Sequence, residues 1–321
     1  MPLTDMPLEE LQKYQGINPK PTDFEKYWDE SISEMKAIDP KIELIPTQEI
    51  VSKNIDCFHL YFTGVGGARI HAHFLKPKKI TGKLPAIAQF HGYTGNRGDW
   101  LNKLAWANEG FIVASMDCRG QGGQSEDSSQ VPGNTHHGHI IRGLDDSNPK
   151  KLLFRQIFLD TAQLAGILMN MPEVDSTRVA SMGGSQGGAL AIACAALEPR
   201  IYRTASTFPF LSDYKRTWKM DLCKDAYAEL RTYFRSFDPL HEREEEIFTK
   251  LGYIDIQHLA PRIRAHVLMS VGLMDPICPP STQFAMYNKI TSKKSLRIYP
   301  DFGHEGLPKD IDAVFGFLTK S

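Results

Sequence analysis

A serine flanked by glycines forms the motif that most directly indicates chemistry in this sequence. Residues 183–187 read Gly-Gly-Ser-Gln-Gly and match the pattern Gly-x-Ser-x-Gly, with Ser185 at its centre. The pattern is typical of a nucleophile elbow, in which a strand turns sharply into a helix and presents the serine hydroxyl at the turn. Glycines are needed there because side chains would collide with the neighbouring strand and helix. We therefore predict that Ser185 is a nucleophile and that Gly183 and Gly187 shape its turn.

The same motif also fits two other local structures. One is a glycine-rich turn with a surface serine, and the other is a phosphate-binding loop. The common phosphate loop requires a lysine before a serine or threonine, and residues 183–188 contain no lysine. The strand-like residues 176–179 before the motif and the alanine-rich residues 189–197 after it favour the elbow.

A serine hydroxyl is a weak nucleophile and needs a neighbouring base, which a carboxylate must hold in the right tautomer. His304 lies in a glycine-flanked loop before a terminal helical stretch, and Asp275 follows the end of a strand-like run. The order serine, acid, histidine along the chain is that of the α/β-hydrolase fold. We predict that Ser185, Asp275 and His304 form a catalytic triad.

Other acids and histidines compete for these roles. Asp301 lies three residues from His304, which suits it better to bracing the loop than to orienting the imidazole. The other histidines after the serine are expected in the wrong places, either in a helical stretch or at the opening end of a strand: His241, His258 and His266.

The oxyanion of an acyl-transfer intermediate needs preorganised N–H donors. We predict the backbone N–H of Gln186, directly after the nucleophile, and that of Tyr93, in the turn after the strand-like residues 84–90. His91 in the same turn is expected to be a structural hydrogen-bonding residue. Arg119 could bind a substrate carboxylate, although an ion pair that ties loops together is the favoured interpretation.

Strand-like and helical stretches alternate from residue 84 onward, and the strands are apolar throughout. This pattern predicts a mostly parallel central sheet flanked by helices on both faces, an α/β class, with chemistry at the carboxyl ends of the strands. Strands are expected at 84–90, 111–117, from 176, at 202–208, 265–272 and 295–299, and helices at 99–108, 151–169, 189–197, 282–290 and 309–318.

The rest of the chain is predicted to add to this sheet within one domain of residues 1–321. Thr22 and Glu25 have the spacing of a capping box and open an amphipathic helix that reaches about residue 38. The expected additions are an N-terminal arm and helix over residues 1–54, a hairpin of residues 55–62 and 68–75, and a helical insertion over residues 209–259.

Composition excludes several classes of partner. The net charge is −1 and no lysine or arginine block occurs, so nucleic acid and acidic membrane surfaces are not expected partners. The longest clean apolar run, residues 189–197, is too short to span a bilayer, and the polar N-terminus does not resemble a signal peptide. Five cysteines without a Cys-x-x-Cys pair predict reduced thiols and a cytoplasmic protein.

Histidines outside the predicted triad raise the question of a metal. His71 and His73 should face one side of a strand, but a two-histidine site needs a third ligand and none is obvious. His136, His137 and His139 crowd a loop over residues 124–149 that lacks the acidic or cysteine partners of a closed site. We therefore predict no metal and no cofactor.

Taken together, the motifs resemble carbohydrate esterase family seven, the acetyl xylan esterase and cephalosporin C deacetylase group. The similarity extends over nearly the whole chain, including the N-terminal helix and residues 208–213. It implies that Gly92, Gly120, Gln121 and Glu305 support the site. The motifs are His91-Gly92-Tyr93-x-Gly95, Arg119-Gly120-Gln121, Gly183-Gly184-Ser185-Gln186-Gly187 and His304-Glu305.

The resemblance implies an α/β-hydrolase fold and an intracellular serine esterase. Such an enzyme removes O-acetyl groups from small acetylated sugars, xylo-oligosaccharides and cephalosporin C through an acetyl-serine intermediate, and can also make peracids from esters and peroxide. It implies a homo-oligomer, a hexamer in which the insertion over residues 209–259 lies at interfaces. The histidine-rich residues 135–139 depart from the family pattern and leave substrate preference open.

Two other functions remain open at this stage. A peptidase, or a carboxylesterase for longer acyl chains, would use the same triad. A binding protein on a hydrolase fold usually loses one member of the triad, and here none is missing.

Overall fold

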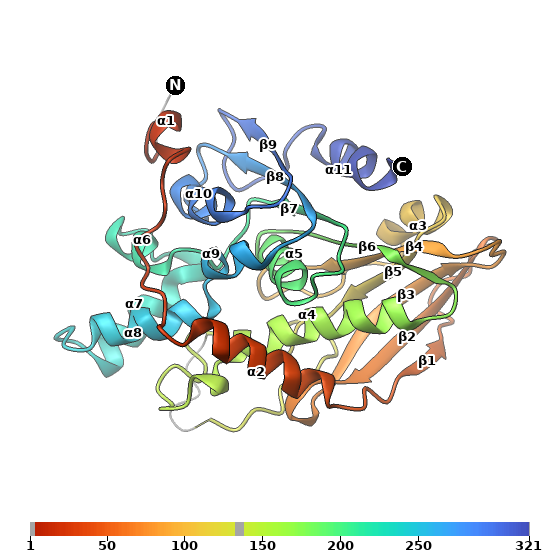
Figure 1. Cartoon of the computed structure of the whole chain (residues 1–321), viewed down its shortest axis with the longest axis horizontal. Helices are drawn as coiled ribbons and strands as arrows, with labels where there is room; N and C mark the ends of the chain where they lie inside the picture. The colour runs from red at the N-terminus through yellow and green to blue at the C-terminus, as the bar shows by residue number, and fades with distance from the viewer. Residues whose placement is uncertain (1–3, 132–137, 321) are drawn as a thin grey trace.

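Nine strands form one sheet in the computed structural model, which describes residues 4–131 and 138–320. In chain order they are β1 (Glu43–Pro46), β2 (Ile55–Thr63), β3 (Arg69–Pro77), β4 (Leu84–Phe90), β5 (Ile112–Met116), β6 (Val174–Gly184), β7 (Arg203–Thr207), β8 (His266–Gly272) and β9 (Lys294–Tyr299). Their order across the sheet is β1-β2-β3-β5-β4-β6-β7-β8-β9 (Figure 1).

The predicted mostly parallel sheet is confirmed. Strands β5, β4, β6, β7, β8 and β9 pair in parallel, so their carboxyl ends meet at one edge. The predicted hairpin β2–β3 joins this sheet through an antiparallel pairing of β3 with β5. Strand β1 was not expected, because all four of its residues are exposed and carry no alternating apolar pattern.

Helices cover both faces of the sheet (Figure 1). Two separate groups of buried apolar side chains lie on the two faces, the larger one against α5. Every residue of α5 is buried, and its alanine-rich sequence lets it pack closely on the strands. The larger group includes α2 (Phe24–Lys36), α4 (Leu153–Asn170), α5 (Gln186–Leu197) and α10 (Pro280–Lys289), and the smaller one α3 (Leu101–Asn108) and α11 (Asp310–Thr319).

Helix α2 starts differently from the prediction. It begins at Phe24, and Asp23 at its N-cap makes no side-chain capping bond, so the predicted capping box of Thr22 and Glu25 is not formed. The Glu25 carboxylate accepts hydrogen bonds from Lys20 at 2.8 Å and Arg262 at 2.7 Å instead. Lys20 and Arg262, both outside the helix, therefore bind the Glu25 carboxylate that a capping box would need.

Residues between β7 and β8 contain the predicted helices and lie at one end of the molecule (Figure 1). Asp213, at their start, accepts hydrogen bonds from Tyr14 Oη at 2.8 Å and from the backbone N–H of Asn18 at 2.8 Å. The N-terminal arm is thus fastened to this helical segment. The segment comprises α6 (Tyr214–Lys219), α7 (Ala228–Phe237), α8 (Glu244–Leu251) and α9 (Ile256–Leu259), and a short α1 (Leu8–Leu11) lies in the arm.

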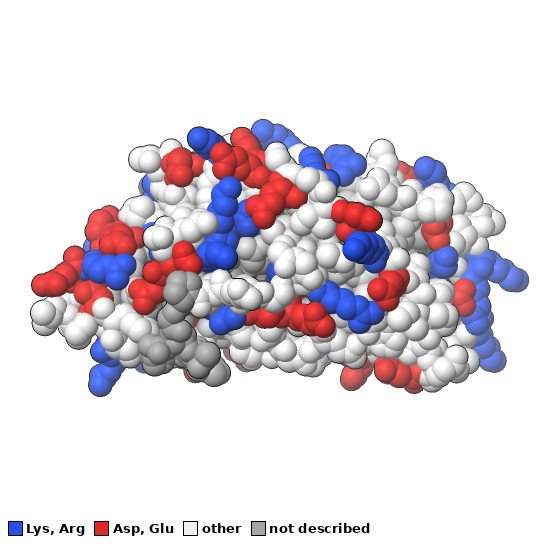
Figure 2. All heavy atoms as spheres, turned by 90° about the horizontal axis from the view of Figure 1, so that it is seen from below, with Lys and Arg blue, Asp and Glu red and all other residues white. Residues whose placement is uncertain are grey.

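The surface and the thiols agree with the composition. Figure 2 shows basic and acidic side chains mixed across one face, with neither sign dominating it. All five cysteines are buried and unpaired. Over residues 4–131 and 138–320, no helix combines the length and the apolar character that crossing a membrane requires.

The turn from β6 into α5 is closed by backbone contact. A Cβ added to Gly187 would lie 2.2 Å from the carbonyl oxygen of Phe90 in β4, and one added to Gly183 would lie 2.5 Å from the carbonyl carbon of Gly187. Both distances are far below van der Waals contact with groups that cannot rotate away. Only glycine fits at either position, as the motif predicts.

We expect Gly187→Ala to lower the melting temperature and to displace Ser185 from its turn, because overpacking against backbone costs about 1–3 kcal/mol. Gly166→Ala is the matched control. It lies within α4 with no heavy atom within 4 Å of an added Cβ, so alanine should stabilise the helix by about 1 kcal/mol. Thermal unfolding of both variants checks this, and shifts of the same sign would contradict it.

Candidate active site

Ser185 lies between β6 and α5 in a backbone conformation that few residues adopt. Its φ is 56° and its ψ is −122°, and such a geometry is strained for a residue with a side chain. Three main-chain hydrogen bonds hold it: the Ser185 N–H donates to Thr207 at 2.9 Å, and its carbonyl accepts from Ala189 at 3.0 Å and Phe210 at 3.1 Å. The surrounding strands and helix therefore fix the serine at the carboxyl edge of the sheet.

The structure brings Ser185, His304 and Asp275 into one hydrogen-bonded chain, which we call the Ser–His–Asp relay. His304 Nε2 lies 3.0 Å from Ser185 Oγ, and His304 Nδ1 lies 2.8 Å from Asp275 Oδ2. An anionic carboxylate can only accept, so Nδ1 carries the ring proton and Nε2 has a free lone pair toward the serine hydroxyl. This is the arrangement that activates a serine.

Asp275 is held in one orientation by backbone hydrogen bonds. Its side chain is buried, and Oδ1 accepts the backbone N–H groups of Ile277 at 2.9 Å and Cys278 at 2.8 Å. The competing acid, Asp301, is exposed. Glu305 accepts the backbone N–H of Gly303 at 3.0 Å and so braces the loop that carries His304.

The competing histidines lie elsewhere, as their places in the sequence suggested. His266 opens β8 and lies 3.2 Å from Ser295 Oγ at the start of β9, at the opposite edge of the sheet from Ser185. His258 lies in α9, and His241 lies between α7 and α8.

The turn after β4, which carries Tyr93, is fixed by His91. His91 Nε2 accepts the backbone N–H of Cys118 at 2.9 Å, so its Nδ1 carries the proton and donates to the Gly92 carbonyl at 2.7 Å. Burial lowers the pKa of His91, in agreement with this neutral tautomer. A Cβ on Gly92 would meet no heavy atom within 4 Å, so sterics do not explain this glycine.

Gln186 connects the elbow to the turn after β5. Its side chain and that of Gln121 exchange amide hydrogen bonds of 2.8 and 3.0 Å. Its Nε2 also lies 3.3 Å from the His91 carbonyl. The backbone N–H groups of Gln186 and Tyr93 donate to no other described residue, and the N-terminal end of α5 adds a positive dipole at this edge.

Arg119 forms a buried ion pair that accounts for its donors. Its Nε and Nη2 donate to the two carboxylate oxygens of Asp160 in α4, at 2.5 and 2.7 Å, and both side chains are almost fully buried. The guanidinium therefore ties the turn after β5 to α4, and its position does not suit a substrate carboxylate. Gly120 follows with φ 61°, a left-handed conformation that favours glycine.

Two residues beside the predicted site were missed in the sequence. Glu229 of α7 accepts the Tyr93 hydroxyl and, at 2.9 Å, the backbone N–H of Ile141, and its burial raises its pKa to about 7. Cys278 is buried and its side chain contacts that of Ser185. Nothing in the sequence separates Glu229 from other acids of the insertion, whereas Cys278 follows Asp275 by three residues and could have been noticed.

The histidine-rich stretch reaches Tyr93 at its end. His139 packs edge-on against the Tyr93 ring, with ring centroids 5.3 Å apart, and its backbone N–H donates to the Tyr93 hydroxyl at 3.2 Å. His136 and His137 lie outside the described residues.

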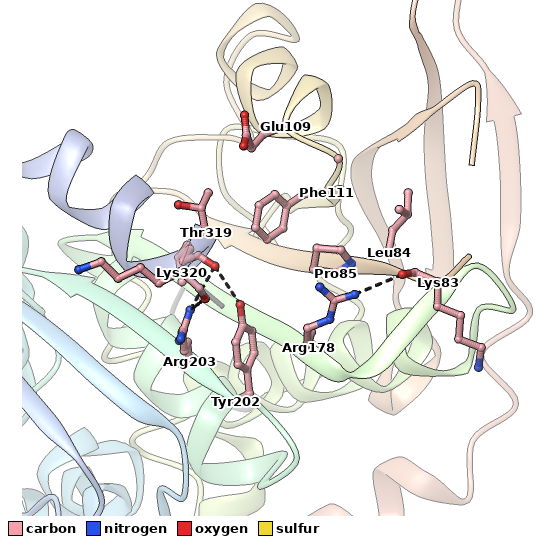
Figure 3. Close-up of a pocket in the computed structure, with 12 residues that line it drawn as sticks. Lys83, Leu84, Pro85, Glu109, Phe111, Arg178, Tyr202, Arg203, Thr319 and Lys320 are labelled. Atoms are coloured by element: carbon pink, nitrogen blue, oxygen red, sulfur yellow. Dashed lines mark hydrogen bonds between the residues drawn. The ribbon is translucent and has the colours of Figure 1, made fainter. Parts of the chain in front are cut away.

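A cavity of about 610 Å³ lies at the other edge of the sheet (Figure 3). It is lined by residues at the amino ends of β4, β6 and β7 and at the end of α11, whereas the relay lies at the carboxyl ends. Arg203 Nη1 donates to the Phe317 carbonyl at 2.9 Å, and the Tyr202 hydroxyl donates to that of Leu318 at 3.0 Å. These hydrogen bonds hold the C-terminal helix against the sheet.

Comparisons with known proteins identify a family over the whole chain. A family model described as acetyl xylan esterase matches residues 1–321. Acetyl esterase Axe7A of Xylanibacter ruminicola is 26% identical over 315 residues, which cover 92% of this chain and 69% of that protein. The crystal structure of acetyl xylan esterase 1 from Thermoanaerobacterium sp. JW/SL YS485 is 58% identical, with a TM-score of 0.96 over 98% of both chains. Acetyl xylan esterase from Paenibacillus sp. R4 is 35% identical, with a TM-score of 0.93 over 98% and 99% of the two chains.

We expect Glu229→Gln to change how stability depends on pH. The wild-type carboxyl is protonated in the folded and unfolded chain below about pH 4.5. Between there and its folded pKa of about 7, only the unfolded chain loses the proton, so wild-type stability falls as pH rises. Glutamine cannot ionise, so the melting temperature of the variant relative to wild type should rise from pH 4.5 to 7. Thermal unfolding across this range checks it, with exposed Glu242→Gln as control, and parallel curves would contradict it.

Proposed function

The chain belongs to the acetyl xylan esterase family, and on that premise we propose that it removes O-acetyl groups from acetylated xylo-oligosaccharides through an acetyl-Ser185 intermediate. Membership makes the protein a carboxylic ester hydrolase. The observation that carries the proposal is the relay at the carboxyl edge of the sheet, with Ser185 Oγ 3.0 Å from His304 Nε2.

In the first half of the proposed reaction, the hydroxyl of Ser185 attacks the acetyl carbonyl and passes its proton to His304 Nε2. The imidazolium that forms is stabilised by Asp275, which already accepts its Nδ1–H at 2.8 Å. The tetrahedral intermediate then expels the sugar oxygen, which takes the proton from His304 Nε2 and leaves as a free hydroxyl. The acetyl group is left on the serine.

The negative charge of the intermediate needs donors that are fixed beforehand, because fixed donors require no reorganisation as the charge develops. In this proposal they are the backbone N–H groups of Gln186 and Tyr93. Two contacts support this assignment: the paired amides of Gln186 and Gln121, and the bond from the Tyr93 hydroxyl to Glu229. They fasten the two donor segments to the turn after β5 and to α7.

In the second half, a water molecule takes the position of the leaving sugar. His304 Nε2 accepts one water proton as the hydroxide attacks the acetyl carbon, and the second intermediate collapses to acetate and free Ser185. The imidazole returns the proton to the serine oxygen, so the enzyme is regenerated with no net change. The proposal requires no metal and no cofactor.

Substrates of the same chemistry extend the proposal to other small acetylated sugars and to cephalosporin C, whose acetyl group is likewise an ester of a primary or secondary alcohol. The acetyl xylan esterases that this chain resembles support the acetyl group as the acyl part. The attachment of the histidine-rich stretch to Tyr93 places its end beside the proposed oxyanion donors.

We also propose that the protein assembles as a homo-oligomer through the helical segment between β7 and β8, a hexamer by family resemblance. Leu240, in the turn between α7 and α8, is 78% exposed and would lie at such an interface. The proposed compartment is the cytoplasm, and the five unpaired cysteines agree with a reducing environment.

We expect Ser185→Ala to lower kcat by about 10⁶-fold and Asp275→Asn by on the order of 10⁴-fold, since the asparagine would favour the wrong tautomer of His304. Asp301→Asn is the matched control, because this acid is exposed and close in sequence to His304, and it should leave kcat unchanged. Initial rates with nitrophenyl acetate check all three. Turnover that survives in Ser185→Ala would remove the proposed nucleophile.

We expect initial rates to fall sharply from nitrophenyl acetate to butyrate, and deacetylation of peracetylated xylobiose and cephalosporin C to proceed with Ser185 intact. Acetate release, measured against the Ser185→Ala variant, separates enzymatic from spontaneous hydrolysis. A preference for butyrate or longer chains would instead indicate a general carboxylesterase. Cleavage of peptide substrates alone would indicate a peptidase.

A further inference from the structure

Three histidines meet on β2 and β3, apart from the Ser–His–Asp relay. His59 of β2 is paired directly with His73 of β3, and His71 lies two residues away on the same face. One ring nitrogen from each of the three lies within 4.8 Å of the other two. His71 and His73 are buried and the His59 side chain is 14% exposed, so solvent reaches the group from one side. The strand pairing supplies the third ligand that was not obvious in the sequence.

We propose that His59, His71 and His73 bind a divalent transition-metal ion, of which Zn²⁺, Ni²⁺ and Cu²⁺ suit imidazole ligands best. His59 Nδ1 lies 2.9 Å from His71 Nε2, with one proton shared between two lone pairs. Zinc–nitrogen bonds of about 2.0–2.1 Å place two tetrahedral ligands about 3.3 Å apart. The two nitrogens therefore need to move apart by only a few tenths of an ångström for an ion to replace the shared proton.

In two of the three histidines, a carboxylate lies beside the ring nitrogen that faces away from the proposed ion. Asp117 Oδ2 lies 2.7 Å from His71 Nδ1, which fixes the ring proton there and leaves the Nε2 lone pair facing His59. Glu49 Oε1 lies 3.6 Å from His59 Nε2, and the Trp100 indole donates to its other oxygen at 2.7 Å. When the ion binds His59 Nδ1, the displaced proton can move to Nε2, beside Glu49. Such outer carboxylates orient metal-binding histidines and raise their basicity.

Arg97 competes with the ion. Its Nε donates to His73 Nε2 at 2.8 Å, so the proton of His73 sits on Nδ1, which has no hydrogen-bond partner although it is buried. His73 can bind an ion through either nitrogen only after this bond is broken, because Nε2 must be vacated or must take the proton. The guanidinium has another acceptor nearby, since its Nη1 lies 3.4 Å from Asp117.

Charges of both signs surround the three histidines. Asp117 and Glu49 face the group with negative charge, and Arg97 and Lys103 face it with positive charge. Trp100 stacks on His73 with ring centroids 3.4 Å apart and prevents that ring from turning away.

The ion would join segments that are distant in the sequence. Asp117 also accepts the backbone N–H groups of Arg97 at 2.8 Å and Gln124 at 2.9 Å, so an ion on His71 would be linked to the turns after β4 and β5. Within residues 4–131 and 138–320, no hydrogen bond joins these histidines to the relay. The expected effect of the ion is therefore greater stability of the hairpin β2–β3, with no part in ester hydrolysis.

The test is a calorimetric titration of the metal-free protein with Zn²⁺ and Ni²⁺ at pH 7.5, with thermal unfolding in the presence and absence of each ion. His59→Asn should weaken binding at least about tenfold, since even the loss of an outer-shell partner costs about 10–100-fold. Glu49→Gln should weaken it by a smaller factor. Arg97→Met should tighten it, because the competitor for His73 is removed. Each ion should raise the melting temperature of wild type and not of His59→Asn.

One control variant and the comparison with His59→Asn separate this site from binding elsewhere. A His136→Asn, His137→Asn double variant removes the other histidine-rich stretch and should bind like wild type. Asp275, Cys278 and His304 could also take up Zn²⁺, so the decisive quantity is the site that disappears in His59→Asn. The proposal is overturned if wild type and His59→Asn bind and melt alike, or if Arg97→Met binds no more tightly than wild type.

Discussion

The contact between the Phe90 carbonyl and Gly187 is the constraint on which the rest of the site depends. It brings the end of β4 against the first turn of α5, at 2.2 Å from where a Cβ would lie. Ser185, two residues before Gly187, has its positive φ at this contact, and the turn that carries Tyr93 follows Phe90 directly. One backbone contact therefore presents the hydroxyl and arranges the two proposed oxyanion donors around it. Side chains could not achieve this, because they would fill the space that the backbone uses.

Parallel strand pairing does the remaining positioning. Ser185, Asp275 and His304 come from β6, β8 and β9, more than a hundred residues apart at the extremes, and meet because parallel strands end at one edge. Loops alone would leave their distances variable. Backbone hydrogen bonds then remove the last freedom, as in the two N–H groups that hold Asp275 and the one that holds Glu305.

The sequence was informative where one residue type permits only one structure. Glycine at 183 and 187, and the order of serine, acid and histidine, led to the sheet and to the relay residues. It was uninformative where a partner is set by packing. Asp160, the partner of Arg119, and Glu229, the partner of Tyr93, lie on helices. In the sequence, nothing distinguishes them from the other acidic residues there. Strand β1 and the failed capping box were misjudged because edge pairing and ion pairs with Lys20 and Arg262 depend on tertiary contacts. His59 could not be grouped with His71 and His73 from the sequence, because only the register of β2 on β3 brings it beside them.

The two histidine networks share one feature, an aspartate that accepts a hydrogen bond from a histidine Nδ1, but the feature has a different role in each. Asp275 on His304 and Asp117 on His71 each fix the ring proton on Nδ1 and leave the Nε2 lone pair exposed. What faces that lone pair decides its use. A serine hydroxyl faces His304, so the lone pair can take a proton during acyl transfer. A second imidazole faces His71, with a third ring nearby, and this is a set of ligands rather than a nucleophile and its base. The same carboxylate–imidazole pair thus gains its function from the group that faces its Nε2.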